Sequence, residues 1–386
     1  MEKPGVGSHA CTLDIVRTEA DLAALVPEWE QLWRGVTQAR ATQAPQWSLC
    51  SWRLLKDNAD VELFVICVRM AGNLVGVVPL KLEREAGGNV LKYLGLGYDE
   101  FAGVVLRDDV DKRAIMNQVI DEVIRRGDIA RISIKNLPDE SPLSAALLER
   151  KLAFTRWTKP RYFIRWGADD DWDAYLLSTR SKTSLRKYDR LRRKLILETG
   201  AALVRESDPA VIAMTVDWIF QNKIAAFEER GVGAFLDEET HKRFMIDVAS
   251  SEDSDNHIGV YALKSPEKII AAVIIAHGKG ISEGLIITHD PEYAAFAPGR
   301  IAFEQSAADA FSTREEYDFG PGDHQWKRTW RTGEAVYRHV ELYLSLRAAA
   351  MREPGIFLGR LPGRVKGKIT HHARQLRRKF RLASPQ

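Results

Sequence analysis

The sequence GISEGLIITHDPEYAAFAPGRIAFEQSAADAFSTREEYDFGPGDHQWKRTWRTGEAVYRHVELYLSL, residues 280–346, decides the fold. It reads as an apolar strand, a loop ending at 297–300, an amphipathic helix, a short strand, a Gly-rich turn with Trp326 and Lys327, and a last alternating strand. The first turn of a helix offers unpaired N–H groups and the positive end of the helix dipole. We therefore expect the loop at 297–300 to hold a phosphate or pyrophosphate.

The length and composition indicate a globular protein of two domains. The chain has 386 residues, which is more than one ordinary hydrophobic core accommodates. Apolar residues make up 45% and charged residues 28%, which is the balance of a folded protein with a charged surface. The formal net charge of +3 leaves the class of partner open, so the placement of the basic residues matters more than their number.

The cysteines and the apolar runs bear on compartment and on metal binding. Cys11, Cys50 and Cys67 are widely spaced and form no CxxC or Cys/His grouping, so we expect neither a disulfide framework nor a metal site. The N-terminus lacks an apolar run of signal-peptide length, and the longest apolar stretch, 269–276, is too short to span a bilayer. These features predict a cytoplasmic protein, with contact at the inner face of the membrane left open.

The hydrophobic patterns of the two halves of the chain follow the same order. Each half reads as strand, helix, helix, three strands, helix, strand and closing strand. A three-strand meander followed by a crossover helix is typical of a mixed, mostly antiparallel sheet with helices on both faces. The repeat lies in the order of elements rather than in matching residues. We therefore predict two tandem α/β (α+β) domains at 12–170 and 201–348, after a disordered N-terminus at 1–11.

A strongly basic segment at 171–200 connects the two predicted domains. Its apolar residues form the narrow stripe of an amphipathic helix. Two interpretations stay open: a connecting helix with a solvated charged face, or a wall that binds a substrate phosphate or an acidic glycan. The basic residues are Arg180, Lys182, Arg186, Lys187, Arg190, Arg192, Arg193 and Lys194.

The residues at 349–386 form a basic C-terminal tail. No acidic residue follows residue 353, while nine residues from 354 onward are Lys or Arg. A solvated tail and a tail held by charge to anionic lipid or polymer are both compatible with this composition.

Several short motifs resemble one group of acyltransferases. Residues 317–327, YDFGPGDHQWK, resemble the aspartate, glycine and aromatic-lysine signature of GNAT-like acyltransferases grouped with cellulose and exopolysaccharide biosynthesis proteins. The helix start at 181–186 and the PGR loop at 298–300 are similar to two further markers, and Gln46, Trp47 and the hairpin ending at 76–80 resemble the N-terminal half. The resemblance spans residues 12–346 and implies two tandem GNAT-like domains, distantly similar to Fem-type peptidyltransferases.

The resemblance also implies the donor. It suggests transfer of an acyl group to an amine or hydroxyl, with acetyl-CoA or another acyl-CoA as cosubstrate and no tightly bound cofactor. Familiar GNAT enzymes bind pyrophosphate with Q/R-x-x-G-x-G/A, whereas this chain has Pro298, Gly299, Arg300 and Ile301. Because proline has no N–H to donate, we expect the amides of Gly299, Arg300 and Ile301 and the Arg300 guanidinium to bind the donor.

Acyl transfer needs a base for the nucleophile and N–H groups for the developing oxyanion. Glu283 lies in an apolar strand and would suit a general base if burial raised its pKa; the alternative is an exposed strand glutamate. Gly284 marks either a β-bulge whose amides face the oxyanion or a glycine tolerated for packing. Asp318 is the second candidate catalytic residue, or the cap of a turn before Gly320.

The remaining candidate residues would contact substrate. Lys327 matches the aromatic-lysine pair of the family and would bind a phosphate as a point charge. Asp323 brackets the same turn, and Trp326 belongs either to the substrate site or to the core. Lys182 and Arg186, at the start of the basic helix, complete this set of substrate-binding predictions.

The N-terminal half has no equivalent of the PGR loop. Its acidic residues at 108–111 precede a helix and would repel a phosphate, so we expect this half to form one wall of an acceptor cleft. We expect an amino sugar or polysaccharide precursor as acceptor, no DNA partner, and leave the oligomeric state open. Two other functions stay open: Fem-type peptidyl transfer from aminoacyl-tRNA, and a catalytically degenerate scaffold in polysaccharide assembly.

Overall fold

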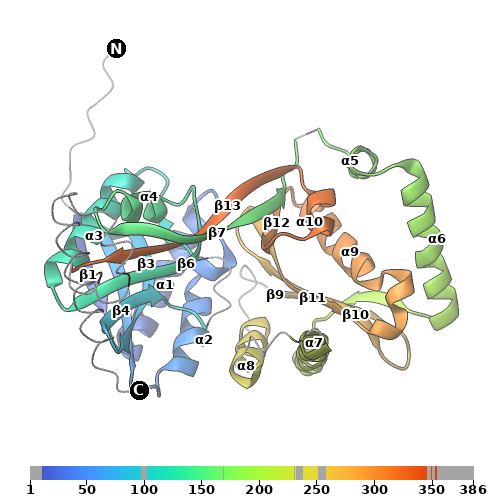
Figure 1. The fold of residues 1–386 in the computed structure, drawn as a ribbon, viewed down its shortest axis with the longest axis horizontal. Coiled ribbons are helices and arrows are strands. Elements are labelled where there is room, and N and C mark those ends of the chain that lie inside the picture. The colour runs from blue at the N-terminus through green and yellow to red at the C-terminus, as the bar shows by residue number, and fades with distance from the viewer. Residues whose placement is uncertain are drawn as a thin grey trace, which may run out of the picture.

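The computed structural model describes residues 11–96, 102–167, 169–229, 231, 238–250, 258–345, 349 and 353. The expectations for residues 1–10 and for the basic tail from 354 lie outside these residues. Figure 1 shows two lobes that lie side by side, with β7 (Ala153–Ile164) and β13 (Gly333–Tyr343) running between them.

The elements follow the predicted order with a few additions. The first part of the chain contains β1 (Cys11–Val16), α1 (Glu19–Gly35), η1 (Ala41–Gln43), α2 (Pro45–Leu55), β2 (Val61–Met70), β3 (Asn73–Glu85), β4 (Gly88–Tyr93), β5 (Val105–Leu106), α3 (Lys112–Arg126), β6 (Ile129–Pro138), α4 (Pro142–Leu148) and β7. The second part contains α5 (Trp172–Thr179), α6 (Lys182–Thr199), β8 (Ala202–Arg205), α7 (Pro209–Glu229), α8 (Glu238–Ala249), β9 (Ile258–Lys264), β10 (Ile269–His277), β11 (Ile281–His289), η2 (Pro291–Phe296), α9 (Pro298–Ser312), β12 (Glu316–Pro321), α10 (Gln325–Trp330) and β13.

Among the described residues the strands form one continuous sheet in the order β1-β2-β3-β4-β6-β13-β7-β12-β11-β10-β9-β8, with β5 beside β3. In the first lobe β1 to β4 pair antiparallel and β4 pairs with β6 in parallel. In the second lobe β8 to β11 pair antiparallel and β11 pairs with β12 in parallel. The predicted fold class is therefore confirmed: two mixed, mostly antiparallel α/β halves in tandem.

The two halves exchange their closing strands. Strand β7, from the first half of the sequence, pairs with β12, and β13, from the end of the chain, pairs with β6. The two exchanged strands pair with each other from Gly333 to Leu342. The sequence pattern predicted both strands but not this arrangement, because alternation of apolar residues identifies a strand and not its neighbour.

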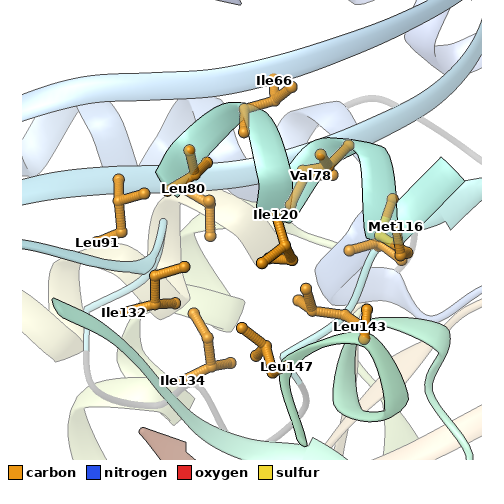
Figure 2. Packing of buried hydrophobic residues seen from close by; sticks show 14 of the residues in the cluster. Ile66, Val78, Leu80, Leu91, Met116, Ile120, Ile132, Ile134, Leu143 and Leu147 are labelled. Carbon is orange, nitrogen blue, oxygen red and sulfur yellow. The ribbon is translucent and has the colours of Figure 1, made fainter. Parts of the chain in front are cut away.

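The core of the first lobe has two layers on opposite faces of the sheet. Helices α3 and α4 cover one face, and α1 and α2 cover the other. Figure 2 shows the first layer, in which side chains of α3 and α4 meet those of the sheet: Met116, Ile120, Leu143 and Leu147 against Ile66, Val78, Leu80, Leu91, Ile132 and Ile134. Val340 and Leu342 of β13 are buried in this layer, so the end of the chain completes the core of the first lobe.

The second lobe is also covered on both faces. Helix α9 packs on one face together with α5, α6 and α10, while α7 and α8 pack on the other. Trp47 of α2 is buried in the α7–α8 layer, with its ring edge-on to Phe244 at 4.9 Å between centroids. The first half of the chain therefore contributes side chains to both lobes.

Two local predictions are corrected. The segment that carries Trp326 and Lys327 is the short helix α10 rather than a Gly-rich turn. The basic connecting segment breaks at Arg180, and Ser181 caps a new helix by accepting a hydrogen bond from the Ser184 amide at 3.2 Å. Of the described helices, none is long and apolar enough to cross a membrane.

We expect Leu342→Ala to destabilise the first lobe although Leu342 lies near the C-terminus. The side chain is 2% exposed in the α3–α4 layer, and such a truncation costs about 2–5 kcal/mol. Chemical denaturation should show this loss, and hydrogen exchange should quicken first in β6 and α3. Leu197→Ala is the matched control, because Leu197 on α6 is 86% exposed and the change should stay within about 0.5 kcal/mol. Loss of protection confined to β8–β12 would contradict the strand exchange.

Candidate active site

Strands β11 and β12 part at two neighbouring carboxylates. Their parallel pairing joins Ile281 to Glu316 and ends with Glu283 beside Asp318. On the other edge of β11 the register shifts, because Ile274 faces Ile286 while Ile275 faces Gly284. The predicted bulge at Gly284 is confirmed.

The Glu283 side chain is fully buried, so the alternative of an exposed strand glutamate is wrong. Its Oε1 atom accepts a hydrogen bond from Arg40 Nη1. Its Oε2 atom is also buried and has no hydrogen-bond partner among the described residues. The hydrogen bond from Arg40 therefore holds one of the two carboxylate oxygens.

Asp318 is buried to the same extent but is saturated with donors. Its Oδ2 atom accepts from Arg161 Nε at 2.5 Å, Tyr337 Oη at 2.7 Å and Arg40 Nη1 at 3.2 Å. Its Oδ1 atom accepts from the Gly320 amide at 2.9 Å, which is the turn cap considered as the alternative for this residue. These contacts suit a buried counterion better than a base that must collect a proton.

The two carboxylates differ in their pKa because their surroundings differ. Burial raises the pKa of Glu283 to about 7, and the nearby Asp318 carboxylate adds to the rise, against the opposing effect of Arg40. Burial also opposes ionisation of Asp318, but Arg161 and Arg40 outweigh it and hold the pKa of Asp318 below its ordinary value. Near neutral pH, Glu283 is therefore the one of the pair that can exchange a proton.

The ionic network extends to a cavity between the lobes. Arg161 also donates to Glu316 and, through Nη1 at 2.8 Å, to Glu140, while Arg165 Nε donates to Glu316 at 2.9 Å. A cavity of about 270 Å³ lies beside these groups, lined by Arg40 and by these side chains together with the 102–104 and 138–142 segments. Residues of both halves of the chain therefore line one polar cavity beside the ionic network.

The predicted donor loop starts α9 as expected. Pro298 is the first residue of α9, and Ala297 before it has a φ of 52°. The Arg300 amide already donates to the Ala297 carbonyl at 3.0 Å, which corrects the expectation that this amide is free. Ile301 is 7% exposed and its side chain belongs to the core, while Gly299 has only ordinary contacts around its Cα.

The Arg300 guanidinium lies against the basic segment. Its Cζ atom is 3.5 Å from the ring centroid of Tyr188 on α6, and Nε is 3.5 Å from Glu304. Arg180 lies 3.4 Å from the ring centroid of Trp330 close by, and burial together with Arg300 lowers the pKa of Arg180 to about 10. The structure therefore brings the donor loop and the start of α6 together at a cluster with two arginines.

The predicted substrate residues lie on separate elements. Lys182 and Arg186 are exposed on the first turns of α6. Lys327 is buried, and its Nζ donates to the carbonyls of Gly320 at 3.1 Å and Pro321 at 3.0 Å. These hydrogen bonds connect α10 to the end of β12.

The other two residues of the 317–327 motif are also held by protein contacts. Asp323 accepts from Tyr162 Oη at 3.0 Å and pairs with Arg328. Trp326 is 38% exposed and packs edge-on to Phe303 at 5.3 Å between centroids. Of the predicted residues, Glu283 and Asp318 alone meet directly at the parting strands.

Sequence reasoning missed three residues that surround the carboxylates. Arg161 lies in the extended segment β7, Tyr337 in the alternating strand β13, and Arg40 in the irregular stretch between α1 and α2. Arg161 directly precedes the apolar end of β7, 162–164, which was a weak signal for it. Arg40 carried no such signal, because its position depends on a contact with residues more than 200 positions later.

Comparison with known proteins gives a match over part of the chain. Residues 182–328 match the family model of the acetyltransferase (GNAT) domain. The structure is similar to that of FemX, with 11% identity, 89% of this chain and 100% of that chain covered, and a TM-score of 0.58. It is also similar to a conserved protein of unknown function from Bacteroides thetaiotaomicron, with 10% identity, coverage of 86% and 100%, and a TM-score of 0.53.

These likenesses have a limited reach. At such identities they show the shared fold and nothing about substrates, and no curated protein matches the chain in sequence.

The described residues contain no group of three or more His, Cys, Asp or Glu side chains that could hold a metal ion.

We expect the pKa of Glu283 to appear as a pH dependence of stability. A folded pKa of about 7, above the ordinary 4.5, gives stabilisation that is complete below pH 4.5 and lost as pH rises through 7. The free energy of unfolding of the native protein should therefore fall by about 3 kcal/mol relative to Glu283→Gln between pH 4.5 and 8.

Urea unfolding of both proteins across this pH range is the measurement. Glu341→Gln is the control, because Arg156 and Arg131 outweigh burial and hold the pKa of Glu341 below its ordinary value. Its stability difference from the native protein should stay nearly constant above pH 4.5. A constant difference for Glu283→Gln as well would show that Glu283 is ionised throughout.

Proposed function

We propose that this protein is an acyl-CoA-dependent N-acyltransferase that transfers an acyl group, acetyl in the simplest case, to an amine or hydroxyl. The acceptor in this proposal is an amino sugar or a polysaccharide precursor, in keeping with the resemblance to the cellulose and exopolysaccharide group. The GNAT-type domain supports acyl transfer in general. The donor, the acceptor and the residues that act on them are the proposed part.

One observation carries the proposal: Glu283 ends the pairing of β11 with β12, directly before a bulge in the pairing of β11 with β10. A bulge at this position turns a backbone N–H away from the sheet, where it can meet the thioester oxygen. The buried Oε2 of Glu283 has no partner among the described residues, and a pKa near 7 suits a general base. Glu283 would take the proton of the acceptor amine while the amine attacks the thioester carbonyl. Collapse of the tetrahedral intermediate then breaks the C–S bond, and the coenzyme A thiolate leaves and takes up a proton.

The donor enters this proposal from the side of α9. The first turn of α9 and its dipole would attract an anionic group, and Gly299 adds no side chain of its own to the start of this helix. Arg300 and Arg180 place two positive charges beside one carboxylate, Glu304. A phosphate of the donor would relieve the repulsion between the two guanidinium groups.

The acceptor side is the cavity between the lobes. Its rim carries Arg165 and Glu140, which are 66% and 53% exposed at their side chains, so both charge types can contact a polar acceptor. Lys182, Arg186, Asp323, Trp326 and Lys327 remain proposed contacts of the substrates. We place the protein in the cytoplasm, with contact between its basic tail and the inner face of the membrane as part of the proposal.

Isothermal titration with acetyl-CoA tests the donor. We expect micromolar binding and a loss of about tenfold in affinity for Arg300→Gln, because a charge-assisted contact to phosphate is removed. Arg125→Gln is the matched control, since it removes the same charge from the exposed surface of the first lobe and should change the affinity less than about twofold. Equal melting temperatures establish that both variants fold. The absence of binding to acetyl-CoA and to longer acyl-CoA would refute the proposed donor.

A second candidate function is transfer from aminoacyl-tRNA, as in the Fem-type alternative. The observation in its favour is a groove of about 530 Å³ on α6 whose lining contains four basic residues, Arg186, Arg190, Arg193 and Lys194, beside Asp189, Leu197 and Glu198. These positions lie on one face of the helix, and they can contact successive phosphates of a nucleic acid. The likeness to FemX concerns the fold alone.

Retention of charged tRNA at about 150 mM salt tests this candidate. Binding should weaken strongly in the combined variant Arg186→Gln, Arg190→Gln and Arg193→Gln, and its salt dependence should become shallower because fewer counterions are released. Arg113→Gln, Arg125→Gln and Arg84→Gln remove the same charge from the exposed surface of the first lobe and serve as the control. Binding that disappears at 150 mM salt would be nonspecific and would exclude tRNA as donor.

The scaffold alternative predicts no turnover at all. It would be excluded if Glu283→Gln abolished a measured thioester cleavage while the variant kept its fold. Asp318→Asn is less suitable for this purpose, because four donors converge on Asp318 and the substitution would weaken the fold itself.

A further inference from the structure

The loop at 37–43 leaves the first lobe and docks on the second. Ala39 and Lys279 exchange two backbone hydrogen bonds across the lobes, from the Ala39 amide at 3.0 Å and from the Lys279 amide at 2.6 Å. Lys279 lies in the turn between β10 and β11, three residues before Ser282 and four before Glu283. The loop is therefore fixed to the strand that carries the proposed base.

The first lobe holds this loop from its other side. The indole Nε1 atoms of Trp33 and Trp29 donate to the carbonyls of Arg40 and Gln43, each at 3.0 Å. Tyr93 Oη donates to the Thr42 carbonyl at 2.6 Å. Such buried contacts on successive carbonyls fix the backbone of the loop, so the position of Arg40 is determined by both lobes.

Two glycines permit this close approach. A Cβ atom at Gly278 would collide with the Ala39 carbonyl oxygen and with the backbone around Arg40. A Cβ atom at Gly103 would collide with the Gln43 side chain, which accepts the Arg40 amide at 2.9 Å. The absence of side chains at these positions is what lets the loop lie against the second lobe.

The docked loop delivers a guanidinium to the carboxylates. Arg40 is 7% exposed, and its Nη1 atom contacts Glu283 Oε1 and, at 3.2 Å, Asp318 Oδ2. The other charged or titratable groups around Glu283 are Asp318 on β12, Arg161 on β7 and Tyr337 on β13. Arg161 and Tyr337 donate to Asp318, whereas Arg40 donates to Glu283 as well as to Asp318.

We propose that the loop at 37–43 is part of the reaction centre, with Arg40 as the positioning residue that orients the Glu283 carboxylate for its work as a base. The inference rests on the proposed function in one respect, namely that Glu283 is the base. It gives the first half of the chain a defined task, because the second half alone lacks the cation that holds Glu283.

The physical role of Arg40 is both geometric and electrostatic. Its hydrogen bond to Oε1 fixes the rotation of the carboxylate and leaves Oε2 directed elsewhere. Its charge favours the ionised form of a carboxylate that burial pushes towards the protonated form. Without Arg40, Glu283 would remain protonated at neutral pH and could not accept a proton.

The test measures the ionisation of Glu283 without relying on catalysis. Nuclear magnetic resonance of ¹³C-labelled glutamate carboxyl groups, with Glu283→Gln to identify the signal, gives the midpoint of titration in the full chain. We expect a midpoint near 7 in the native protein and one that is higher by about one pH unit or more in Arg40→Met, since removal of an opposite charge at this range has that effect. In Arg40→Lys the midpoint should lie between those of the native protein and Arg40→Met, because the positive charge is kept.

A second variant moves the loop without changing its charge. Gly278→Ala should displace the docked backbone and raise the Glu283 midpoint in the same direction as Arg40→Met. Gly35→Ala is the matched control, because a Cβ there meets nothing within 4 Å, and its midpoint should stay unchanged. If Arg40→Met does not fold, Arg40→Lys and Gly278→Ala provide the test.

The rate of thioester cleavage, with acetyl-CoA as donor and glucosamine as the probe acceptor, supplies the second readout. We expect the acidic limb of the pH–rate profile to shift to higher pH in Arg40→Met and Gly278→Ala, by the same amount as the NMR midpoint. An unchanged midpoint in folded Arg40→Met and Gly278→Ala would overturn the role of Arg40. A shifted midpoint with an unchanged pH profile would instead overturn Glu283 as the base and leave the contact with Arg40 standing.

Discussion

The buried ionic network at the junction of the lobes is the constraint on which the rest of the structure depends. Three guanidinium groups, of Arg40, Arg161 and Arg165, pair with four carboxylates, of Glu140, Glu283, Glu316 and Asp318. Buried charges are tolerated only when they are paired and hydrogen-bonded. Burial raises the pKa of Glu283, and the neighbouring Asp318 carboxylate adds to the rise, against the opposing effect of Arg40.

The strand exchange is what brings these charges together. Strand β7 places Arg161 beside Asp318 on β12, and β13 places Tyr337 over the same carboxylate. If each half closed its own sheet, β7 would stay in the first lobe and Asp318 would lose its main cation. The exchange also gives each lobe a strand from the other half of the sequence. The network and the sheet therefore form together, because each lobe needs a strand from the other half of the sequence to complete its part of the sheet.

The sequence predicted the local structure well and the contacts between distant parts poorly. Periodic apolar residues located the strands β2, β3, β10 and β11, and the PGR sequence located the start of α9. Glu283 and Gly284 stood out because a charge and a glycine interrupt an apolar strand. Arg40 did not stand out, since its role arises only when the loop at 37–43 meets the turn before β11. Lys327 stood out for its motif, yet its ammonium group binds backbone carbonyls within the protein.

The two adjacent carboxylates show how one sheet position can serve structure and chemistry at once. Asp318 and Glu283 face each other in register, and both are fully buried. Asp318 accepts four hydrogen bonds, which favour its ionised form. Protonation of Asp318 would weaken the hydrogen bonds that join the three strands and the loop around it. Glu283 has one donor on one oxygen and feels the permanent charge of Asp318. A pair of carboxylates whose pKa values are pushed apart in this way can divide the tasks: Asp318 fixes the geometry, and in the proposed function Glu283 moves the proton.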